Sequence, residues 1–441
     1  MGEKVLMKGN EAIAEAAIRA GCMHYFGYPI TPQTEIAAYM AKRMPKIGGV
    51  FLQAESEIAA INMVYGVAAT GKRVMTSSSS PGISLKEEGI SYIAGADLPA
   101  LIVNVQRGGP GLGGIQPSQS DYFQATKGGG HGDYHLIVLA PSSVQEMAEL
   151  TVRGFELADN YRMPVMILAD GTMGQMMEPV SMDFAVKAAP EKPWAVTGTK
   201  CERKHNIVNS LYLKPEELER TNFERFERYS IIKENEVMYE EYMTEDADIC
   251  IAAFGIAARV AKNAINEARK QGIKAGMIRP ITLWPFPAKQ FAQAAKHVKH
   301  FISVELSMGQ MIEDVTKSVR RKKEVNDEFV DNLYGCLYVV FDCGAFCGYC
   351  LVGGKGRVVN GEGHLGVWTI VEGGRHVGGT GRKVGICQLF ECVDFFAQFH
   401  DGMCQPFDFV VVVMPLRRIV FAIEQCHSCF GVGVGLYAVF G

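Results

Sequence analysis

Three features that would each indicate a class of protein are missing from most of this sequence. Only 3 of the 12 cysteines precede residue 331, so we expect no disulfide framework there and a reduced, cytoplasmic setting. No run reaches the about 20 apolar residues of a membrane-spanning helix, and the first residues lack the apolar core of a signal peptide. Positive charge is not in excess, because 44 basic side chains accompany 48 acidic ones. We therefore expect no nucleic-acid partner and no membrane partner.

The rest of the composition is that of a large globular protein. The 441 residues are 48% hydrophobic, enough for the cores of two or more domains. From residue 22 to residue 178, apolar runs without polar alternation are separated by helix-like segments. This pattern predicts an α/β fold with a parallel sheet covered on both faces. The expected strands are MHYFGYPI, VFLQAE, RVMTSS, PALIVNVQ, HLIVLAP and PVMILAD.

Two helix starts are predicted near the beginning of the chain. Asn10 precedes the Ala-rich segment EAIAEAAIRA and is expected to cap a helix that ends at Gly21. Thr31 precedes Pro32 and is expected as the N-cap of a second helix, with proline at the first helical position. The stretch GYPITPQTE is thus predicted to be a corner between a strand and a helix.

Ligands of such sheets bind outside the carboxyl ends of the strands. The corners that follow the strands are therefore the places where a site is expected. They are short, and polar or rich in glycine, and we expect them to converge on one rim of the sheet. These corners are GYPITPQ, LQAESE, TSSSSPG and QRGGPGLGG.

Beyond the first domain, the sequence predicts three further regions. Residues 179–245 are charged and contain prolines without clear alternation, as in a linker or arm. Alternation resumes over residues 246–322, where the strands DICIAAFG, KAGMIRPITLWPFP and FISVELSMGQ predict a second, smaller α/β domain. Residues 323–441 form an anomalous tail, because 20 of the 48 glycines but only 2 of the 18 prolines follow residue 330.

We favour an out-of-frame C-terminus as the explanation of this tail. The alternative is a genuine extension that binds an iron–sulfur cluster. Cys343, Cys347 and Cys350 have the C-x3-C-x2-C spacing of a radical-type cluster site, but no barrel domain follows them.

Several residues of the first domain allow both a structural and a functional interpretation. Glu55 and Glu57 open a helix, where acids either complement the helix dipole or take part in chemistry. Arg107 ends a buried strand and needs an anionic partner, which could be a structural carboxylate or a substrate. His131 and Asp133 could serve acid–base chemistry, but a glycine-rich loop is the favoured interpretation of GGGHGDY.

One motif favours a different class of enzyme. Gly109, Gly111 and Gly114 have the G-x-G-x-x-G spacing directly after an apolar strand, which suits a dinucleotide pyrophosphate. The alternative function is therefore a nicotinamide-linked dehydrogenase. The continuation IQPSQSDYF is unlike the tightly packed helix that the fingerprint requires.

Taken in order, several motifs resemble the alpha subunit of the 2-oxoacid:ferredoxin oxidoreductases. The resemblance covers about residues 3–322. The segment GGPGLGGIQPSQSDYFQATKGGGHGDYHLIVLAP is most similar to the branched-chain type, which acts on 2-oxoisovalerate (3-methyl-2-oxobutanoate). The other motifs are YPITP, QAESEIAAINMVYGVAATG, TSSSSPGISL, VQRGGPGLGG, RPITLWPFP and VELSMGQMIEDV.

This resemblance implies a fold and an activity. Residues 1–178 would be a pyrimidine-type thiamine-diphosphate domain, residues 179–245 an arm, and residues 246–322 a transketolase C-terminal-like domain. The enzyme would oxidatively decarboxylate a branched-chain 2-oxoacid to an acyl-coenzyme A and pass the electrons to ferredoxin, as in anaerobic metabolism. The 2-oxoglutarate and pyruvate enzymes remain alternatives within the family.

The resemblance also implies site residues and partners. Glu57 matches the glutamate that hydrogen-bonds the aminopyrimidine of thiamine diphosphate, while Thr31 and Arg107 match residues that bind the substrate carboxylate. The sequence has no G-D-G segment for magnesium and diphosphate, and no C-x-x-C-x-x-C run before residue 323. Magnesium is therefore expected on a beta subunit that shares the cofactor. Iron–sulfur clusters are expected on partner subunits, which include gamma and ferredoxin-like chains.

Overall fold

The computed structural model describes residues 4–320 and seven strands of the later chain. These strands are β14 (Cys336–Val340), β15 (Tyr349–Val352), β16 (Arg357–Glu362), β17 (Val367–Glu372), β18 (Phe409–Val413), β19 (Ile419–Ile423) and β20 (Gly435–Phe440). The predicted cluster ligands Cys343 and Cys347 lie outside the described residues, as does the side chain of Cys350. The out-of-frame hypothesis for residues 323–441 likewise concerns a region that is largely outside them.

The first sheet has seven strands in the order β12-β6-β7-β5-β4-β2-β3. All neighbouring pairs are parallel except β12 with β6, so the predicted α/β fold is confirmed. The parallel strands are β2 (His24–Gly27), β3 (Val50–Gln53), β4 (Val74–Ser78), β5 (Ala100–Gln106), β6 (Ile137–Leu139) and β7 (Pro164–Asp170).

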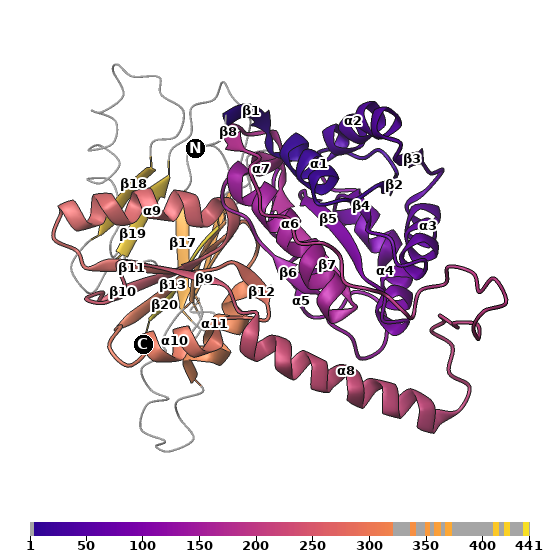
Figure 1. The fold of residues 1–441 in the computed structure, drawn as a ribbon. Coiled ribbons are helices and arrows are strands. Elements are labelled where there is room, and N and C mark those ends of the chain that lie inside the picture. Colours follow the sequence, from indigo (N-terminus) through magenta and orange to yellow (C-terminus); the bar gives the residue numbers. More distant parts are fainter. Residues whose placement is uncertain are drawn as a thin grey trace.

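Helices cover both faces of this sheet (Figure 1). Helices α1 and α6 pack together on one face, and helices α3 and α4 pack together on the other. A small antiparallel pair joins the two ends of this part of the chain, β1 (Lys4–Lys8) and β8 (Met177–Ser181). The helices are α1 (Gly9–Arg19), α2 (Thr34–Arg43), η1 (Met44–Ile47), α3 (Glu57–Ala69), α4 (Ser80–Gly95), α5 (Tyr122–Thr126), α6 (Val144–Tyr161) and α7 (Gly171–Gln175).

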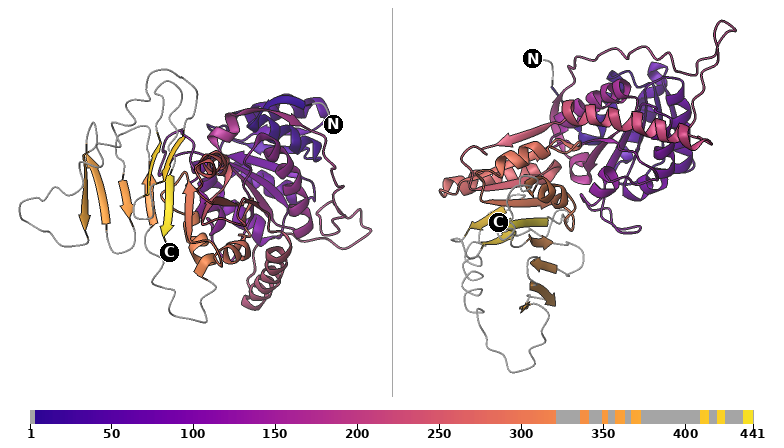
Figure 2. Two further views of the ribbon diagram at one scale, coloured as in Figure 1. Left: turned by 90° about the vertical axis from the view of Figure 1, so that its left-hand side faces the viewer. Right: turned by 90° about the horizontal axis from the view of Figure 1, so that it is seen from below.

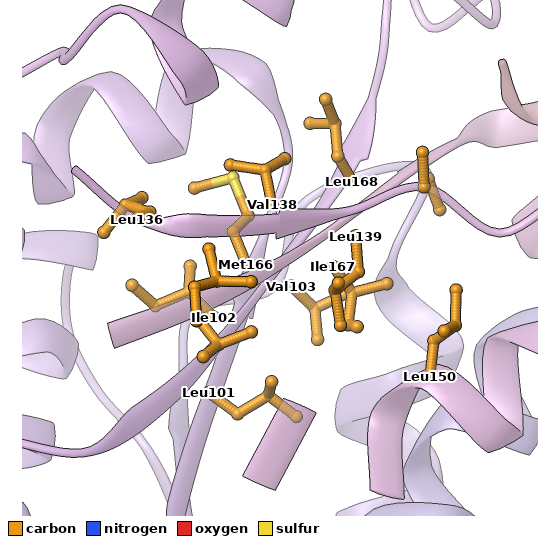
Figure 3. Packing of buried hydrophobic residues seen from close by; sticks show 14 of the residues in the cluster. Leu101, Ile102, Val103, Leu136, Val138, Leu139, Leu150, Met166, Ile167 and Leu168 are labelled. Atoms are coloured by element: carbon orange, nitrogen blue, oxygen red, sulfur yellow. The ribbon is translucent and has the colours of Figure 1, made fainter. Parts of the chain in front are cut away.

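The central strands form the core of the protein. Every residue of β5, β6 and β7 is buried, and Figure 3 shows apolar side chains of these strands packed close together. Because both faces of these strands are covered, their sequences are mostly apolar and show no regular alternation. Their polar residues Asn104, Gln106 and Asp170 lie toward the carboxyl ends of β5 and β7. The coverage of both faces explains why continuous apolar runs located the strands correctly.

Both predicted helix caps are wrong. Helix α1 begins at Gly9, and Asn10 lies inside it, where its side-chain amide donates to the Pro32 carbonyl at 2.8 Å. Helix α2 begins only at Thr34, because the Gln33 N–H bonds the Ile30 carbonyl in a turn that precedes the helix. Tertiary contacts of the corner thus take precedence over local capping preferences.

The second sheet has nine strands, and five of them lie in the order β20-β13-β10-β11-β9. Strand β10 is parallel to β11 and β13, whereas β9 and β20 run antiparallel to their neighbours. The elements are β9 (Tyr239–Tyr242), β10 (Ile249–Ala253), β11 (Ala275–Pro280), β13 (His300–Glu305), α9 (Gly255–Lys270), α10 (Ala288–Ala294) and α11 (Met311–Arg320).

The predicted arm contains helix α8 (Pro215–Asn235), which lies along the outside of the molecule (Figure 2). Among the described residues, no helix combines the length and the apolar character that a bilayer crossing would need.

The predicted strand KAGMIRPITLWPFP is divided between the two sheets, which corrects the sequence prediction. Its first half is β11 of the second sheet, and its second half is β12 (Thr282–Trp284), which pairs antiparallel with β6 of the first sheet. The change of sheet occurs at Ile281, whose N–H bonds the Met238 carbonyl and whose carbonyl accepts from Ala140. The two sheets are therefore joined by backbone pairing as well as by side chains.

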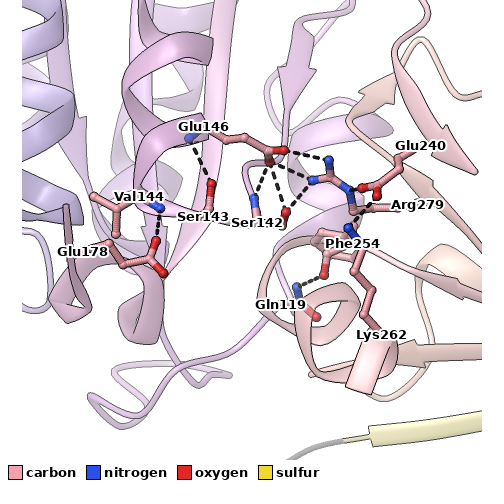
Figure 4. Close-up of polar contacts among 10 residues, drawn as sticks. All are labelled: Gln119, Ser142, Ser143, Val144, Glu146, Glu178, Glu240, Phe254, Lys262 and Arg279. Carbon is pink, nitrogen blue, oxygen red and sulfur yellow. Dashed lines mark hydrogen bonds and ion pairs between the residues drawn. The ribbon is translucent and has the colours of Figure 1, made fainter. Parts of the chain in front are cut away.

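A buried arginine holds the seam between the sheets (Figure 4). Arg279 donates through Nε to Glu240 at 2.8 Å and through Nη2 to Glu146 at 2.8 Å. Its Nη1 donates to the Ser142 hydroxyl at 2.6 Å and to Glu146 at 2.8 Å. All three guanidinium nitrogens are thus bonded, and Lys262 also pairs with Glu240.

Candidate active site

The four predicted corners do converge on one rim of the first sheet (Figure 1). They follow β2, β3, β4 and β5, which are parallel neighbours in the sheet. Hydrogen bonds join the corners directly, since Arg107 after β5 donates to the Thr31 carbonyl at 3.0 Å. Ser80 after β4 also bonds the backbone of Arg107.

Hydrogen bonds to two backbone carbonyl groups fix the corner at Thr31. The Tyr28 carbonyl accepts from the Gln33 side chain at 3.1 Å, and the Thr31 carbonyl accepts from Arg107. Gln33 is itself fixed, because its Oε1 accepts from the buried Ser77 hydroxyl at 2.5 Å. The side chain of Thr31 remains exposed at the rim, on a backbone that the surrounding elements fix.

Arg107 carries a buried charge without a carboxylate partner in the described part of the chain. Its side chain donates to two neutral carbonyl groups, those of Thr31 and Leu112, each at 3.0 Å. The residue is 7% exposed, and its Nε has no hydrogen-bond partner among the described residues. Of the two partners considered from the sequence, a structural carboxylate is therefore not what this arginine binds here.

Ser80 fixes the backbone from which Arg107 projects. Its hydroxyl accepts from the Arg107 N–H at 3.0 Å and donates to the Arg107 carbonyl at 3.1 Å. This serine was not among the site residues predicted from the sequence. The sequence signal that could have identified it is its position at the start of a helix that follows a strand.

Glu57 lies at the start of α3 and is 5% exposed, whereas its neighbour Glu55 is exposed. The N-cap Ser56 accepts from the Ala59 N–H at 3.2 Å, which orients this first turn. The Glu57 carboxylate lies against Gly82 of α4, where an added Cβ would be 2.6 Å from its Oε1. The structure thus separates two glutamates whose positions at the helix start had allowed the same two interpretations.

The same place holds buried hydroxyl groups without partners. Ser78 and Ser79 are both fully buried, and neither Oγ has a hydrogen-bond partner among the described residues. A Cβ added at Gly82 would come within 2.1 Å of the Ser78 Oγ, so the absence of a side chain there keeps that hydroxyl and Glu57 together. Buried polar atoms are normally bonded, and this set of a carboxyl and hydroxyls fits the polar edge of a nitrogen heterocycle such as an aminopyrimidine.

The alternative sites lack the corresponding geometry. The loop with Gly109, Gly111 and Gly114 closes on itself, because the Gly114 N–H bonds the Gly108 carbonyl at 2.9 Å. No helix opens there, so the loop cannot offer a helix N-terminus to a pyrophosphate. His131 and Asp133 are both exposed, which agrees with the loop interpretation.

Two family models match this chain. The model for the thiamine-diphosphate-binding domain of pyruvate flavodoxin/ferredoxin oxidoreductase matches residues 15–260. The model for core domain II of pyruvate:ferredoxin oxidoreductase matches residues 247–341. Together they span the first sheet, the arm and strands β9, β10, β11 and β13 of the second sheet.

Individual relatives agree. Ketoisovalerate oxidoreductase subunit VorB of Methanothermobacter marburgensis is 57% identical, over 70% of this chain and 88% of the relative. The 2-oxoglutarate synthase subunit KorA of Methanothermobacter thermautotrophicus is 38% identical, over 74% of this chain and 93% of the relative. A solved 2-oxoglutarate:ferredoxin oxidoreductase from Magnetococcus marinus is 31% identical with a TM-score of 0.64, and the match covers 72% of this chain and 60% of that one. On this evidence, the chain belongs to the 2-oxoacid:ferredoxin oxidoreductase family.

Proposed function

We propose that this chain is the alpha-type subunit of an enzyme that oxidatively decarboxylates a branched-chain 2-oxoacid to an acyl-coenzyme A and reduces ferredoxin. The rim where Glu57, Thr31 and Arg107 converge is the observation that carries this proposal. The branched-chain substrate is supported by the 57% identity to a ketoisovalerate oxidoreductase subunit, against 38% to a 2-oxoglutarate synthase subunit. 2-Oxoglutarate and pyruvate are the less favoured substrates.

Arg107 would bind the carboxylate of the 2-oxoacid. Its charge is buried and has no anionic partner in the described part of the chain, and an arginine–carboxylate hydrogen bond is stronger than one between neutral groups. The exposed side chain of Thr31 lies on the corner that Arg107 contacts. Thr31 can therefore donate a second hydrogen bond to the same carboxylate.

Glu57 would hold the aminopyrimidine of thiamine diphosphate. Thiamine diphosphate, when bound, supplies the electron sink for decarboxylation. The Glu57 carboxyl group would share a proton with a ring nitrogen, next to the unpartnered hydroxyls of Ser78 and Ser79. General acid–base help of this kind contributes about 10²–10⁴-fold to a rate.

The remaining parts of the enzyme would come from partner subunits. Since this sequence has no G-D-G segment, we assign the magnesium and diphosphate site to a beta subunit. The iron–sulfur clusters would lie on gamma and ferredoxin-like subunits, with the complex in the cytoplasm. The described cysteines Cys22, Cys201 and Cys250 are free thiols, as is usual in a reducing compartment.

Calorimetric titration of thiamine diphosphate and magnesium tests this division of the site. The diphosphate normally supplies most of the charge that anchors the cofactor, so the chain alone should bind weakly and turn over no substrate. Adding the beta subunit should restore binding and, with the remaining subunits, ferredoxin reduction by 3-methyl-2-oxobutanoate in preference to 2-oxoglutarate or pyruvate. Micromolar binding by the lone chain would contradict the proposed half-site.

A further inference from the structure

Lys86 is the only buried lysine among the residues that the structure describes, and its exposed fraction is 0%. It lies within α4, in the segment LKEEG, whose other charged residues are Glu87 and Glu88. Lysine is almost never fully buried unless its charge is paired. The ammonium group makes a single hydrogen bond in the described part of the chain, from Nζ to the Glu57 carbonyl at 3.4 Å.

The packing of α4 on α3 explains how a lysine reaches this position. Gly82, Lys86 and Gly89 are spaced by four and three residues, and therefore share one face of α4. A Cβ at Gly82 would be 2.6 Å from Glu57 Oε1, and a Cβ at Gly89 would be 2.4 Å from the Ile61 side chain. The two glycines let α3 and α4 approach closely. Lys86 lies between the two glycines on the face of α4 that packs against α3, where Glu57 also lies.

In the described part of the chain, Glu57 is the acid whose charge acts on Lys86. On α4 itself, Glu87 points to the Tyr134 hydroxyl at 3.4 Å and Glu88 bonds the Tyr92 hydroxyl. Burial lowers the pKa of Lys86 to about 8, and the charge of Glu57 acts in the opposite direction.

The neighbouring strands contribute no competing charge. Strand β5 has no ionisable side chain. Asp170, at the end of β7, accepts from the Thr172 and Met173 N–H groups instead. Lys86 and Glu57 are therefore two buried ionisable residues at the same contact between helices, joined by the bond from Lys86 Nζ to the Glu57 carbonyl.

We propose that Lys86 is a positioning residue that keeps the Glu57 carboxyl group ionised in its buried site. This inference rests on the proposed role of Glu57. A carboxylate in an apolar site retains its proton unless a cation compensates its charge. With Lys86 charged, Glu57 can remain an anion and accept the hydrogen bond of a protonated ring nitrogen of the aminopyrimidine. Without Lys86, Glu57 would keep the proton and the ring would stay neutral.

Infrared difference spectra of the isolated full chain at pH 7 test this ionisation without cofactor or activity. The protonated-carboxyl band of Glu57 should be absent from the difference between wild type and Glu57→Gln. It should appear in the difference between Lys86→Met and Lys86→Met/Glu57→Gln. Identical differences in the two pairs would overturn the proposal.

Two variants separate charge from hydrogen bonding. Lys86→Met removes both, whereas Lys86→Gln removes the charge and offers an amide donor to the Glu57 carbonyl. Both should lower the turnover of the assembled complex by about tenfold and move the acid limb of the kcat/KM profile up by about one pH unit, since one pH unit is a tenfold change in ionisation. Full rescue by glutamine would assign only the hydrogen bond and overturn the role of the charge.

A double-mutant comparison shows whether Lys86 acts through Glu57. In the Glu57→Gln background, Lys86→Met should change turnover by less than about twofold. Loss of folding in both Lys86 variants, or additive effects on turnover, would assign a separate structural role and contradict the inference. An inactive wild-type complex with the expected infrared differences would instead refute the proposed function and leave the electrostatic pair intact.

Discussion

Arg279 at the seam between the sheets and Arg107 at the rim of the first sheet are both buried, yet they differ in their partners. Arg279 donates to the carboxylates of Glu146 and Glu240 and to a hydroxyl, so its charge is balanced within the chain. Arg107 donates to two neutral carbonyls, and its Nε has no partner among the described residues. A balanced buried charge indicates a structural role, whereas an unbalanced one indicates a place for an anionic ligand.

One hydroxyl group at the seam and two at the rim show the same contrast. Ser142 at the seam donates to Glu146 at 3.1 Å and accepts from Arg279 at 2.6 Å. Ser78 and Ser79 at the rim are buried without a partner in the described part of the chain. Substitutions at the seam should therefore change stability, and substitutions at the rim should change catalysis or binding.

The largest effect is expected at the seam. Arg279→Met leaves the half-buried carboxylate of Glu146 without its cation, whereas Glu240 keeps its pair with Lys262. The free energy of unfolding should therefore fall by about 3 kcal/mol. Urea denaturation measures this change. Lys299→Met is the matched control, because Lys299 pairs at the surface with Asp248 and exposed pairs contribute about 0–1 kcal/mol. Equal losses of unfolding free energy in the two variants would show that Arg279 contributes no more than an exposed ion pair.

At the rim, Glu57→Gln should leave the urea midpoint unchanged and lower the turnover of the assembled complex by roughly 10²-fold or more, the scale of general acid–base help. Glutamine keeps the shape of the side chain but cannot share its proton in the same way. Glu55→Gln, at an exposed neighbour, serves as the control and should remain active. Near-normal turnover of Glu57→Gln would remove this residue from the chemistry.

The stability of the protein is expected to depend on pH through His135, which packs among aromatic side chains. His135 stacks on Trp284 with ring centroids 4.6 Å apart, and burial lowers its pKa from 6.5 to about 4. Between these two values the unfolded chain binds a proton that the folded chain does not, so acidification from pH 6.5 to 4 should cost on the order of 2 kcal/mol of stability. His135→Phe should flatten this part of the stability–pH curve. An unchanged slope would mean that other groups set it.

The smallest effect is expected for Arg107→Lys. Lysine keeps the positive charge but cannot bond Thr31 and Leu112 together with a carboxylate, because it lacks the planar guanidinium group. The KM for the 2-oxoacid should rise by roughly tenfold, while that for coenzyme A should stay unchanged. Steady-state kinetics of the assembled complex distinguish the two substrates. An equal rise in both KM values would make Arg107 a structural residue like Arg279.

The sequence allowed the sheet and the rim to be predicted because these depend on local patterns. Continuous apolar runs marked β5 and β7, and the turn residues after each strand marked the corners. Glu57 and Arg107 stood out through their places at the ends of buried elements and through the family resemblance. These inferences needed no knowledge of contacts between distant segments.

The errors concern positions that tertiary contacts decide. Thr31 has the sequence of a helix cap, but the bond between Gln33 and Ile30 delays the helix start. The burial of Lys86 was not predicted at all, because it depends on the two glycines that let its helix face pack against α3. The division of residues 275–284 between two sheets depends on Met238 and Ala140, which lie far away in the sequence.

Because β12 belongs to the first sheet although it follows β11 of the second sheet, the first sheet stays incomplete while the chain is being synthesised. Strand β6 finds its antiparallel partner only when residues 282–284 have been synthesised, long after the other strands of its sheet have emerged. Until then β6 is an open edge, which can pair with other chains and favours aggregation. An expression product that ends in the arm would keep this edge permanently, so the first sheet is completed only by a chain that continues through Trp284.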